Sequence, residues 1–227
     1  MTDTAMTMMM ALLGLLMVKV GVCLTSSSPL VDRTIAARSA LMEALREERE
    51  ESVLRALLEI QECSAEFVSG DFIDLAVNGD WELLYPLVKS TTVLIDGIDQ
   101  HVEVVEGAGA ATNSIRWTFD EDRGVFETKS TLRATEEARS DFLFSLEGHY
   151  LKPAKKLTSD AAEVVDSMAR TVPFELFDPD LSVASLVYAD PLLKIMKVTG
   201  GKRKRPGFEC HVWGRKEKEP KSSSPRR

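Results

Sequence analysis

The chain has 227 residues, of which 44% are hydrophobic and 28% are charged, a composition typical of globular proteins. Its formal net charge of −8 is unevenly distributed: ten Lys and Arg against three Glu give residues 202–227 a charge of +7, which leaves −15 on residues 1–201. This acidic body argues against nucleic acid as the main partner, because phosphate binding requires a basic field.

The first 38 residues have the composition of a removable targeting leader. Residues 6–24 are almost entirely apolar, and Lys19 inside this run favours a short signal-peptide core over a membrane-spanning helix. The stretch that follows is rich in serine and contains Arg33 and Arg38, as plastid and mitochondrial transit peptides do. Two interpretations are open: a simple secretory signal, or a two-part leader of the type that directs proteins into secondary plastids.

Residues 37–68 carry leucines at helical spacing, among them Leu41 and Leu45. Acid–arginine pairs lie three or four residues apart, as Glu51 and Arg55 do, and such pairs suit the exposed face of a helix. The sequence therefore predicts one helix over this range.

From Asn78 onward, hydrophobic residues alternate with polar ones, which is the period of half-buried strands. We interpret the acidic segment 120–124 as a hairpin turn rather than a cation site. A helix is predicted over residues 160–170, with Asp160 as its N-terminal cap. Further strand-like runs cover residues 181–188, 192–198 and 208–213.

About eight strands with no strand–helix–strand rhythm predict a mainly β protein, either an antiparallel barrel or a sandwich. We expect residues 39–215 to form this domain, including its N-terminal helix. Residues 216–227, which end in KSSSPRR, are expected to be a disordered basic tail.

Three segments carry a family resemblance. Residues 78–85, NGDWELLY, resemble the opening strand of lipocalins, in which the Trp of a Gly-x-Trp motif closes the floor of the barrel. Together with the preceding helix, this segment is similar to the plastid-lipid-associated protein (fibrillin) family. Residues 177–181, FDPDL, resemble the Leu-Asp-x-x-Leu stretch that precedes that family's last strands, although residues 182–186 depart from its usual pattern. Residues 208–215, FECHVWGR, are similar to its closing strand and terminal basic residue.

The resemblance implies an antiparallel, lipocalin-like β-barrel without catalytic activity, located in the plastid at thylakoids or plastoglobules. It implies an apolar lipid as the partner, namely a prenylquinone, a carotenoid or a fatty acid, and no cofactor. It also favours the two-part leader. The alternative function is a peripheral membrane or scaffold protein that docks on anionic surfaces and holds no internal ligand.

Alternation selects the side chains that would face such a ligand. A closed barrel of about eight strands is either filled by side chains or holds one small ligand, and the sequence leaves both alternatives open. Every candidate therefore also fits plain core packing. The candidates are Trp81, Leu83, Tyr85, Ile115, Trp117, Phe119, Phe126, Phe142 and Phe144.

The lipocalin analogy also predicts a pair that closes the barrel. In lipocalins a basic residue of the last strand covers the Trp ring, and Arg215 is the matching partner for Trp81. Alternation that places Phe208, Cys210 and Val212 inward would put Arg215 on the opposite face. We expect a bulge at Gly214 to correct this phase.

A basic cluster near the C-terminus is a candidate for membrane docking, because anionic head groups attract such clusters. It also fits a nuclear or nucleic-acid patch, and it fits a solvated loop between two strands. The cluster consists of Lys202, Arg203, Lys204 and Arg205.

Residues with catalytic or metal-binding chemistry are sparse. The three cysteines and three histidines are too dispersed for a zinc site, and Cys63 and Cys210 are either free thiols or one disulfide. The Asp178-x-Asp180 motif resembles the opening of haloacid-dehalogenase phosphatases, but those enzymes need a parallel α/β domain, for which too few residues follow. The sequence predicts no enzyme and no metal.

Overall fold

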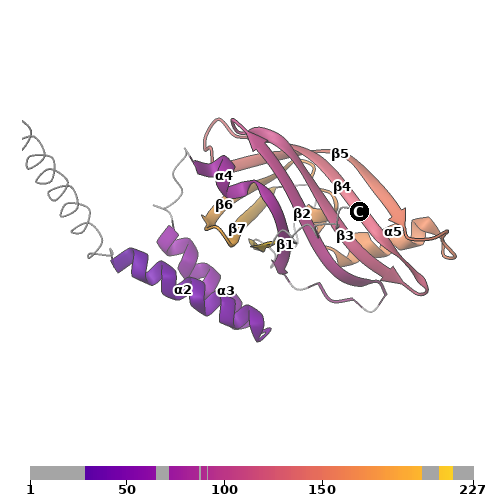
Figure 1. Cartoon of the computed structure of the whole chain (residues 1–227), viewed down its shortest axis with the longest axis horizontal. Helices are drawn as coiled ribbons and strands as arrows, with labels where there is room; N and C mark the ends of the chain where they lie inside the picture. Colours follow the sequence, from indigo (N-terminus) through magenta and orange to yellow (C-terminus); the bar gives the residue numbers. More distant parts are fainter. Residues whose placement is uncertain (1–28, 65–71, 87, 91, 201–209, 217–227) are drawn as a thin grey trace, which may run out of the picture. The chain divides into compact units, whose positions relative to one another are not determined.

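The computed structural model describes residues 29–64, 72–86, 88–90, 92–200 and 210–216 (Figure 1). This part of the chain forms two compact units, a helix pair and a β-barrel, and the boundary between them falls between Cys63 and Ser64. Several segments discussed above lie outside the described residues: residues 1–28 of the leader, Lys202 to Arg205, Phe208, and residues 217–227 of the tail.

The first unit consists of helices α2 (Pro29–Arg46) and α3 (Glu50–Ser64). The prediction of one helix over residues 37–68 is therefore wrong. The chain turns at Glu48, whose φ of 51° is left-handed and ends α2. The predicted leader boundary at residue 38 lies inside α2.

A Schellman-type hydrogen-bond pattern explains the break between α2 and α3. The backbone N–H of Arg49 donates to the carbonyl of Ala44 at 3.0 Å, and that of Glu48 donates to the carbonyl of Leu45 at 3.2 Å. These two bonds satisfy carbonyls that the end of a helix leaves without partners. The acidic residues around this turn are exposed to solvent.

The second unit is a closed barrel of eight antiparallel strands in sequential order, in which β1 pairs with β8. This confirms the mainly β fold, and the architecture is consistent with a lipocalin-like fold. The strands are β1 (Gly79–Tyr85), β2 (Leu94–Val105), β3 (Ala108–Phe119), β4 (Asp122–Ala134), β5 (Asp141–Pro153), β6 (Ser182–Ala189), β7 (Leu193–Gly200) and β8 (Cys210–Arg215).

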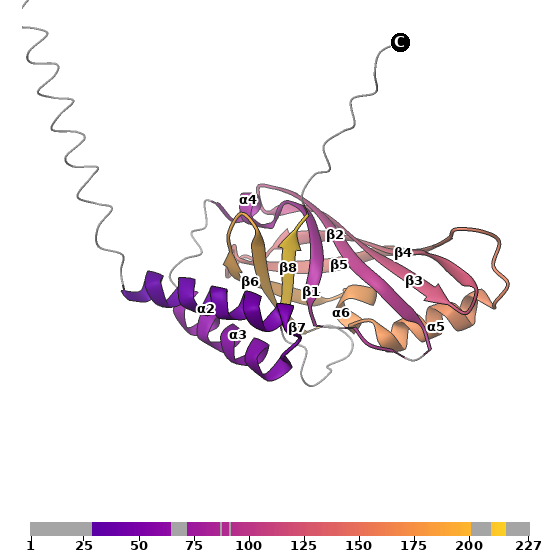
Figure 2. The ribbon, with the colours of Figure 1, turned by 60° about the horizontal axis from the view of Figure 1, so that its bottom comes forward.

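Three short helices accompany the strands. Helix α4 (Ile73–Val77) precedes β1, and helices α5 (Ala161–Thr171) and α6 (Phe174–Phe177) connect β5 to β6. The predicted cap of α5 is confirmed, because the Asp160 side chain accepts a hydrogen bond from the Ala162 N–H at 2.9 Å. Figures 1 and 2 show α4 at one end of the barrel and α5 beside the far ends of the long strands β3 to β5.

The segment α5–α6 packs into the barrel rather than covering its outside. Its apolar side chains, such as Met168 and Leu176, belong to the same core as the inward side chains of the strands. The Phe177 ring stacks on Phe126 with centroids 4.9 Å apart. The Phe177 carbonyl accepts hydrogen bonds from Thr128 at 3.1 Å and His149 at 2.7 Å. The segment therefore fills much of the interior.

The acidic residue at the start of β4 has a structural role. Asp122 is fully buried, and its carboxylate accepts hydrogen bonds from the backbone N–H groups of Thr158 and Ser159 at 2.9 and 2.8 Å. These bonds hold the loop that leads into α5. They also lower the pKa of Asp122 to about 2, chiefly through the Ser159 N–H.

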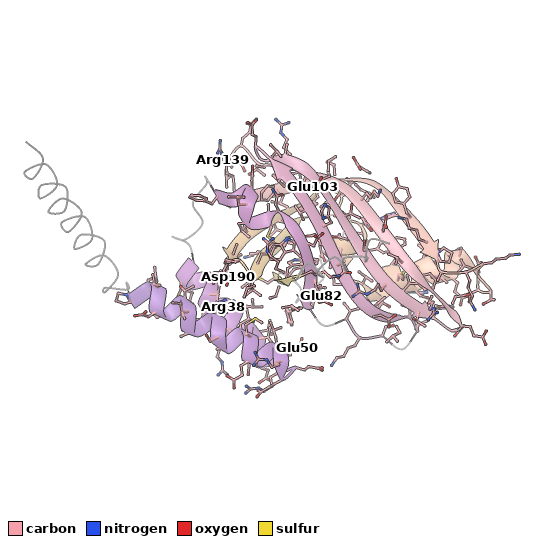
Figure 3. All side chains as sticks on the ribbon, in the orientation of Figure 1. Arg38, Glu50, Glu82, Glu103, Arg139 and Asp190 are labelled. Atoms are coloured by element: carbon pink, nitrogen blue, oxygen red, sulfur yellow. The ribbon has the colours of Figure 1, made fainter. Side chains whose placement is uncertain are left out.

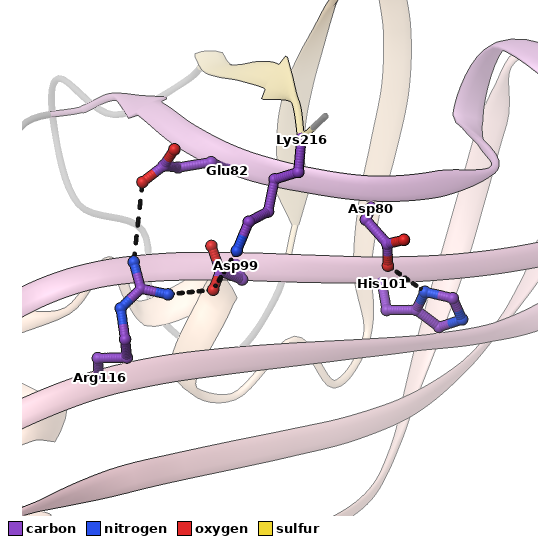
Figure 4. A network of polar contacts seen from close by, with 6 residues as sticks. All are labelled: Asp80, Glu82, Asp99, His101, Arg116 and Lys216. Carbon is purple, nitrogen blue, oxygen red and sulfur yellow. Dashed lines mark hydrogen bonds and ion pairs between the residues drawn. The ribbon is translucent and has the colours of Figure 1, made fainter. Parts of the chain in front are cut away.

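The outer face of the barrel is charged, as Glu82 and Glu103 illustrate in Figure 3. Asp99 of β2 binds Arg116 of β3, and Lys216 reaches the same carboxylate at 3.0 Å (Figure 4). His101 and Asp80 are joined at 2.6 Å, and this hydrogen bond raises the pKa of His101 above its usual value. An exposed pair such as His101–Asp80 contributes ~0–1 kcal/mol.

The remaining sequence motifs have structural positions. Cys63 and Cys210 are both thiols, not a disulfide. In the Asp178-x-Asp180 motif, Asp180 accepts a hydrogen bond from the Leu146 N–H at 3.3 Å. All paired strands are antiparallel among the residues described, so this motif does not sit in the parallel sheet that the phosphatase mechanism requires.

Candidate functional site

The candidate site is a cavity inside the barrel, where α6 meets β2, β3 and β5 to β8. Its volume is about 40 Å³. Its wall has a polar and an apolar part. The polar part consists of Gln100, Asn113, Glu175, Ser182 and His211, and the apolar part of Phe144, Leu176, Pro179, Ala184, Met196, Val198 and Trp213.

Strand alternation directs the polar side chains of the strands inward. Gln100 of β2 has the same phase as the buried Ile98 and Val102. Asn113 of β3 likewise has the same phase as the buried Ile115. Because side chains two residues apart share a face of a strand, these amides face the core.

Three hydrogen bonds link the buried polar side chains into a chain. The ammonium of Lys194 donates to Gln100 Oε1 at 2.8 Å. Gln100 Nε2 donates to Asn113 Oδ1 at 2.9 Å, and Asn113 Nδ2 donates to the Leu176 carbonyl at 3.1 Å. These hydrogen bonds run from β7 across β2 and β3 to α6, and they therefore link α6 to the strands.

Lys194 is the most unusual member of this chain, because it is only 1% exposed. Its ammonium lies 4.6 Å from the Trp81 ring centroid and 5.5 Å from that of Trp213, which are cation–π contacts. Burial lowers its pKa well below the usual value, and the positive charge of Arg215 lowers it further. The hydrogen-bonded side chains beside the cavity therefore include a buried lysine that contacts one amide and two indole rings.

The structure brings together Trp81 and Arg215, the pair predicted from the lipocalin analogy. The guanidinium carbon lies 4.2 Å from the Trp81 ring centroid, and the two residues are register partners between β1 and β8. Trp81 is fully buried, and its indole N–H donates to the Val77 carbonyl at 2.9 Å. The pair thus lies at the α4 end of the barrel.

The predicted phase of the last strand is wrong. Trp213 belongs to the barrel core and His211 lines the cavity, whereas Val212, which we expected inside, does not belong to that core. Arg215 therefore shares a face with Trp213 by simple alternation, and no bulge at Gly214 is needed. The irregularity lies in β1 instead, between Leu83 and Tyr85.

His211 contributes a polar atom without a partner. It is 1% exposed, and its Nε2 has no hydrogen-bond partner within the described residues. Burial lowers its pKa to about 4, so the imidazole is neutral at neutral pH. Because His211 lines the cavity, this nitrogen belongs to the polar part of the cavity wall.

The nine predicted ligand-facing residues fall into several places. Phe144 lines the cavity. Six others are buried core residues: Trp81, Ile115, Trp117, Phe119, Phe126 and Phe142. Leu83 is partly buried against this core, and Tyr85 is buried but does not belong to it. Hydrophobic alternation therefore selected mostly core residues and missed the polar residues of the site.

The volume of the cavity limits what it can hold. A cavity needs ~10–15 Å³ to hold one water, so about 40 Å³ accommodates a few waters or one small polar group. Ligand pockets generally have ~300–1,000 Å³. A long lipid chain therefore fits only if part of it stays outside or if α6 is displaced.

Among the described residues, no cluster of His, Cys, Asp or Glu has the arrangement of a metal site. The described helices include none that is long and apolar enough to cross a membrane. Comparisons with protein-family models, with curated proteins and with solved structures found no match to the chain.

Proposed function

We propose that the barrel binds an apolar lipid through its head group, without catalysing a reaction. The observation that carries this proposal is the cavity whose wall combines buried amides and an imidazole with aliphatic and aromatic side chains. Mostly apolar pockets with a few placed polar groups are typical of small-molecule sites, in which the polar groups fix the orientation of the ligand.

Helix α6 is the element that would have to move for a longer ligand to enter the cavity. Leu176 and Pro179 form part of the cavity wall, and α6 has only four residues. The carbonyl groups of α6 accept hydrogen bonds from the side chains of Asn113, Thr128 and His149. A lipid that displaces Leu176 would take over the apolar contacts that this side chain makes with the core.

The class of lipid and the location follow from the family resemblance. The NGDWELLY segment and the closing strand support a plastid-lipid-associated protein that binds a prenylquinone, a carotenoid or a fatty acid. The composition of the leader supports delivery to the plastid. Thylakoids or plastoglobules are the corresponding lipid surfaces.

A second function, a lipid-surface scaffold with a filled barrel, is supported by apolar side chains near the α4 end. Four of them are 61–74% exposed: Phe72, Leu75, Val105 and Leu192. Val105 and Leu192 line one surface groove together with Asn78. Exposed apolar groups of this kind mark contact with lipid or protein surfaces. The small volume of the cavity also agrees with a filled barrel.

Extraction separates the two functions. The full chain would be purified from its native source, extracted with organic solvent and analysed by mass spectrometry. A lipid in one-to-one amount with the folded protein is expected if the barrel is a carrier. An extract without lipid would contradict lipid binding and would favour the scaffold.

A further inference from the structure

In a groove on the outside of the barrel, the guanidinium of Arg215 has no counter-ion among the described residues. The groove lies at the α4 end and is lined by residues of β1, β2 and β8, Arg215 among them. No described carboxylate lies within ion-pair distance of this half-buried arginine, and its buried Nε has no hydrogen-bond partner. A charge that is partly removed from water is unfavourable without a partner, so the groove lacks an anion.

Two residues of β1 fix where this guanidinium lies. Its carbon is 4.2 Å from the centroid of the Trp81 ring. Gly79 leaves room for it, because a Cβ at that position would lie 2.5 Å from Arg215 Nη1, and the φ of 118° at Gly79 also favours glycine. Neither contact supplies a hydrogen-bond acceptor. The terminal N–H groups, which match a phosphate in bidentate geometry, therefore stay available.

The acidic side chains of the same groove already have a partner. Asp80 Oδ1 lies 2.6 Å from His101 Nδ1 (Figure 4), and Glu103 Oε1 lies 3.3 Å from His101 Nε2. These carboxylates prevent a broad basic surface, which would attract any anion. Recognition of an anion in this groove therefore depends on one specific contact, made by Arg215.

Exposed apolar side chains at the same end of the barrel indicate what carries the anion. Val105 and Leu192 are exposed and line the groove, and the Leu192 carbonyl accepts a hydrogen bond from the Arg215 backbone N–H at 2.8 Å. A peptide that binds a sheet pairs with a free strand edge, but β1 pairs with both β2 and β8 here. A lipid surface needs no such edge, and it offers hydrocarbon and anionic groups together.

We infer that Arg215 binds the phosphate of an anionic phospholipid when the α4 end of the barrel lies on a lipid surface. This inference rests on the second proposed function, the lipid-surface scaffold, and adds the class of head group that the surface provides. The phosphate accepts hydrogen bonds from the terminal N–H groups of the guanidinium, and the acyl chains contact Val105 and Leu192. In a zwitterionic head group, the ammonium competes with Arg215 for the phosphate.

Co-sedimentation of the full chain with two kinds of vesicle tests the inference. One kind consists of phosphatidylcholine, and the other of phosphatidylcholine and phosphatidylglycerol in equal parts. We expect the wild type to bind the vesicles with phosphatidylglycerol about fivefold or more tighter, the effect of one basic residue near an anionic surface. Equal binding to both kinds would overturn the phosphate site while the scaffold function stands. Binding to neither kind would overturn both and would assign the groove to a soluble anion.

Substitutions of single arginines separate a specific site from diffuse attraction. Arg215→Gln should lower the affinity for vesicles with phosphatidylglycerol about fivefold. Arg139→Gln removes the same charge from an exposed position near α4 (Figure 3) and should change this affinity little. An equal loss in both variants would overturn the site.

Arg215→Lys is the second variant should Arg215→Gln fail to fold, because it keeps the charge beside Trp81. An ammonium does not bind a phosphate in bidentate geometry, so we expect this variant also to bind vesicles with phosphatidylglycerol more weakly than the wild type. Unchanged affinity in the folded Arg215→Lys protein would overturn the assignment to the guanidinium.

Discussion

The guanidinium carbon of Arg215 lies 4.2 Å from the centroid of the Trp81 ring, and the two residues are register partners across the seam between the last and the first strand. Lys194 approaches the same ring, at 4.6 Å. Trp81 thus contacts two cations where the barrel closes. Since an indole face attracts cations, this arrangement helps to close the barrel.

Loss of the Arg215 contact should weaken the barrel. We expect Arg215→Leu to lower the free energy of unfolding by ~0.5–2 kcal/mol, the range of cation–π contacts, and Arg215→Lys to lower it less. Urea unfolding at neutral pH measures both. Arg123→Leu, at an exposed position of β4, is the matched control. An Arg215→Leu protein as stable as the wild type would show that the contact contributes nothing.

Replacement of Lys194 should alter the alkaline pH dependence of stability. The pKa of Lys194 is lowered in the folded state, so between that value and 10.5 the unfolded chain binds more protons, and wild-type stability should rise with pH there. Lys194→Met should remove this rise. Urea unfolding from pH 7 to 10.5 tests this, with Lys152→Met on the outer surface as control. Parallel profiles of wild type and Lys194→Met would contradict the prediction.

His211 should produce acid sensitivity. Its pKa is lowered from 6.5 to about 4, so the unfolded chain takes up a proton first, and the stability present above pH 6.5 is lost as pH falls toward 4. His211→Phe should remove roughly 2–4 kcal/mol of this loss. Unfolding measured at several pH values between 7 and 4 gives the slope of the free energy of unfolding against pH.

His101 provides a control of opposite sign. Its pKa is raised by the hydrogen bond with Asp80, so its contribution is present below pH 6.5 and lost as pH rises through the folded pKa. His101→Gln should therefore change stability mainly at acidic pH, by less than about 1 kcal/mol, because the pair is half exposed. If the free energy of unfolding falls equally between pH 7 and pH 4 in His211→Phe and in the wild type, His211 is not the source of the acid sensitivity.

Asp122 should matter in a more acidic range. Its pKa is lowered from 3.8 to about 2, chiefly by the Ser159 N–H, so the stability it contributes is present above pH 3.8 and lost as pH falls to about 2. Asp122→Asn should lower the melting temperature at pH 7, and the difference should shrink toward pH 2. Calorimetry measures it. Asp120→Asn, in the same turn, is the matched control, and a similar pattern in both variants would contradict the assignment.

The strands and the cap of α5 could be predicted because they follow from local patterns. The period-two alternation in β3 and β4 and the acid at residue 160 depend on neighbours in the sequence. The turn at Glu48 could not be predicted in the same way. It occupies a left-handed conformation without glycine or proline, so no residue signals it.

The polar side chains inside the barrel were not predicted from the sequence, for a related reason. Gln100 and Asn113 lie in phase with apolar residues, which is a detectable signal that they are buried, but alternation was used only to select hydrophobic side chains. Lys194 gives no such signal, because all residues from Leu193 to Met196 are buried and the alternation disappears. Burial on both faces of a strand depends on tertiary packing, which the local sequence does not encode.

The most direct test of lipid binding inside the barrel compares lipid content in two variants of β7. Val198 lines the cavity, and Thr199, the next residue, is exposed. Each chain would be purified from the native source and extracted, and the lipid would be quantified by mass spectrometry. We predict one lipid per chain in the wild type and in Thr199→Phe, and a large loss in Val198→Phe. Equal lipid in all three proteins, or none in the wild type, would contradict binding in this cavity.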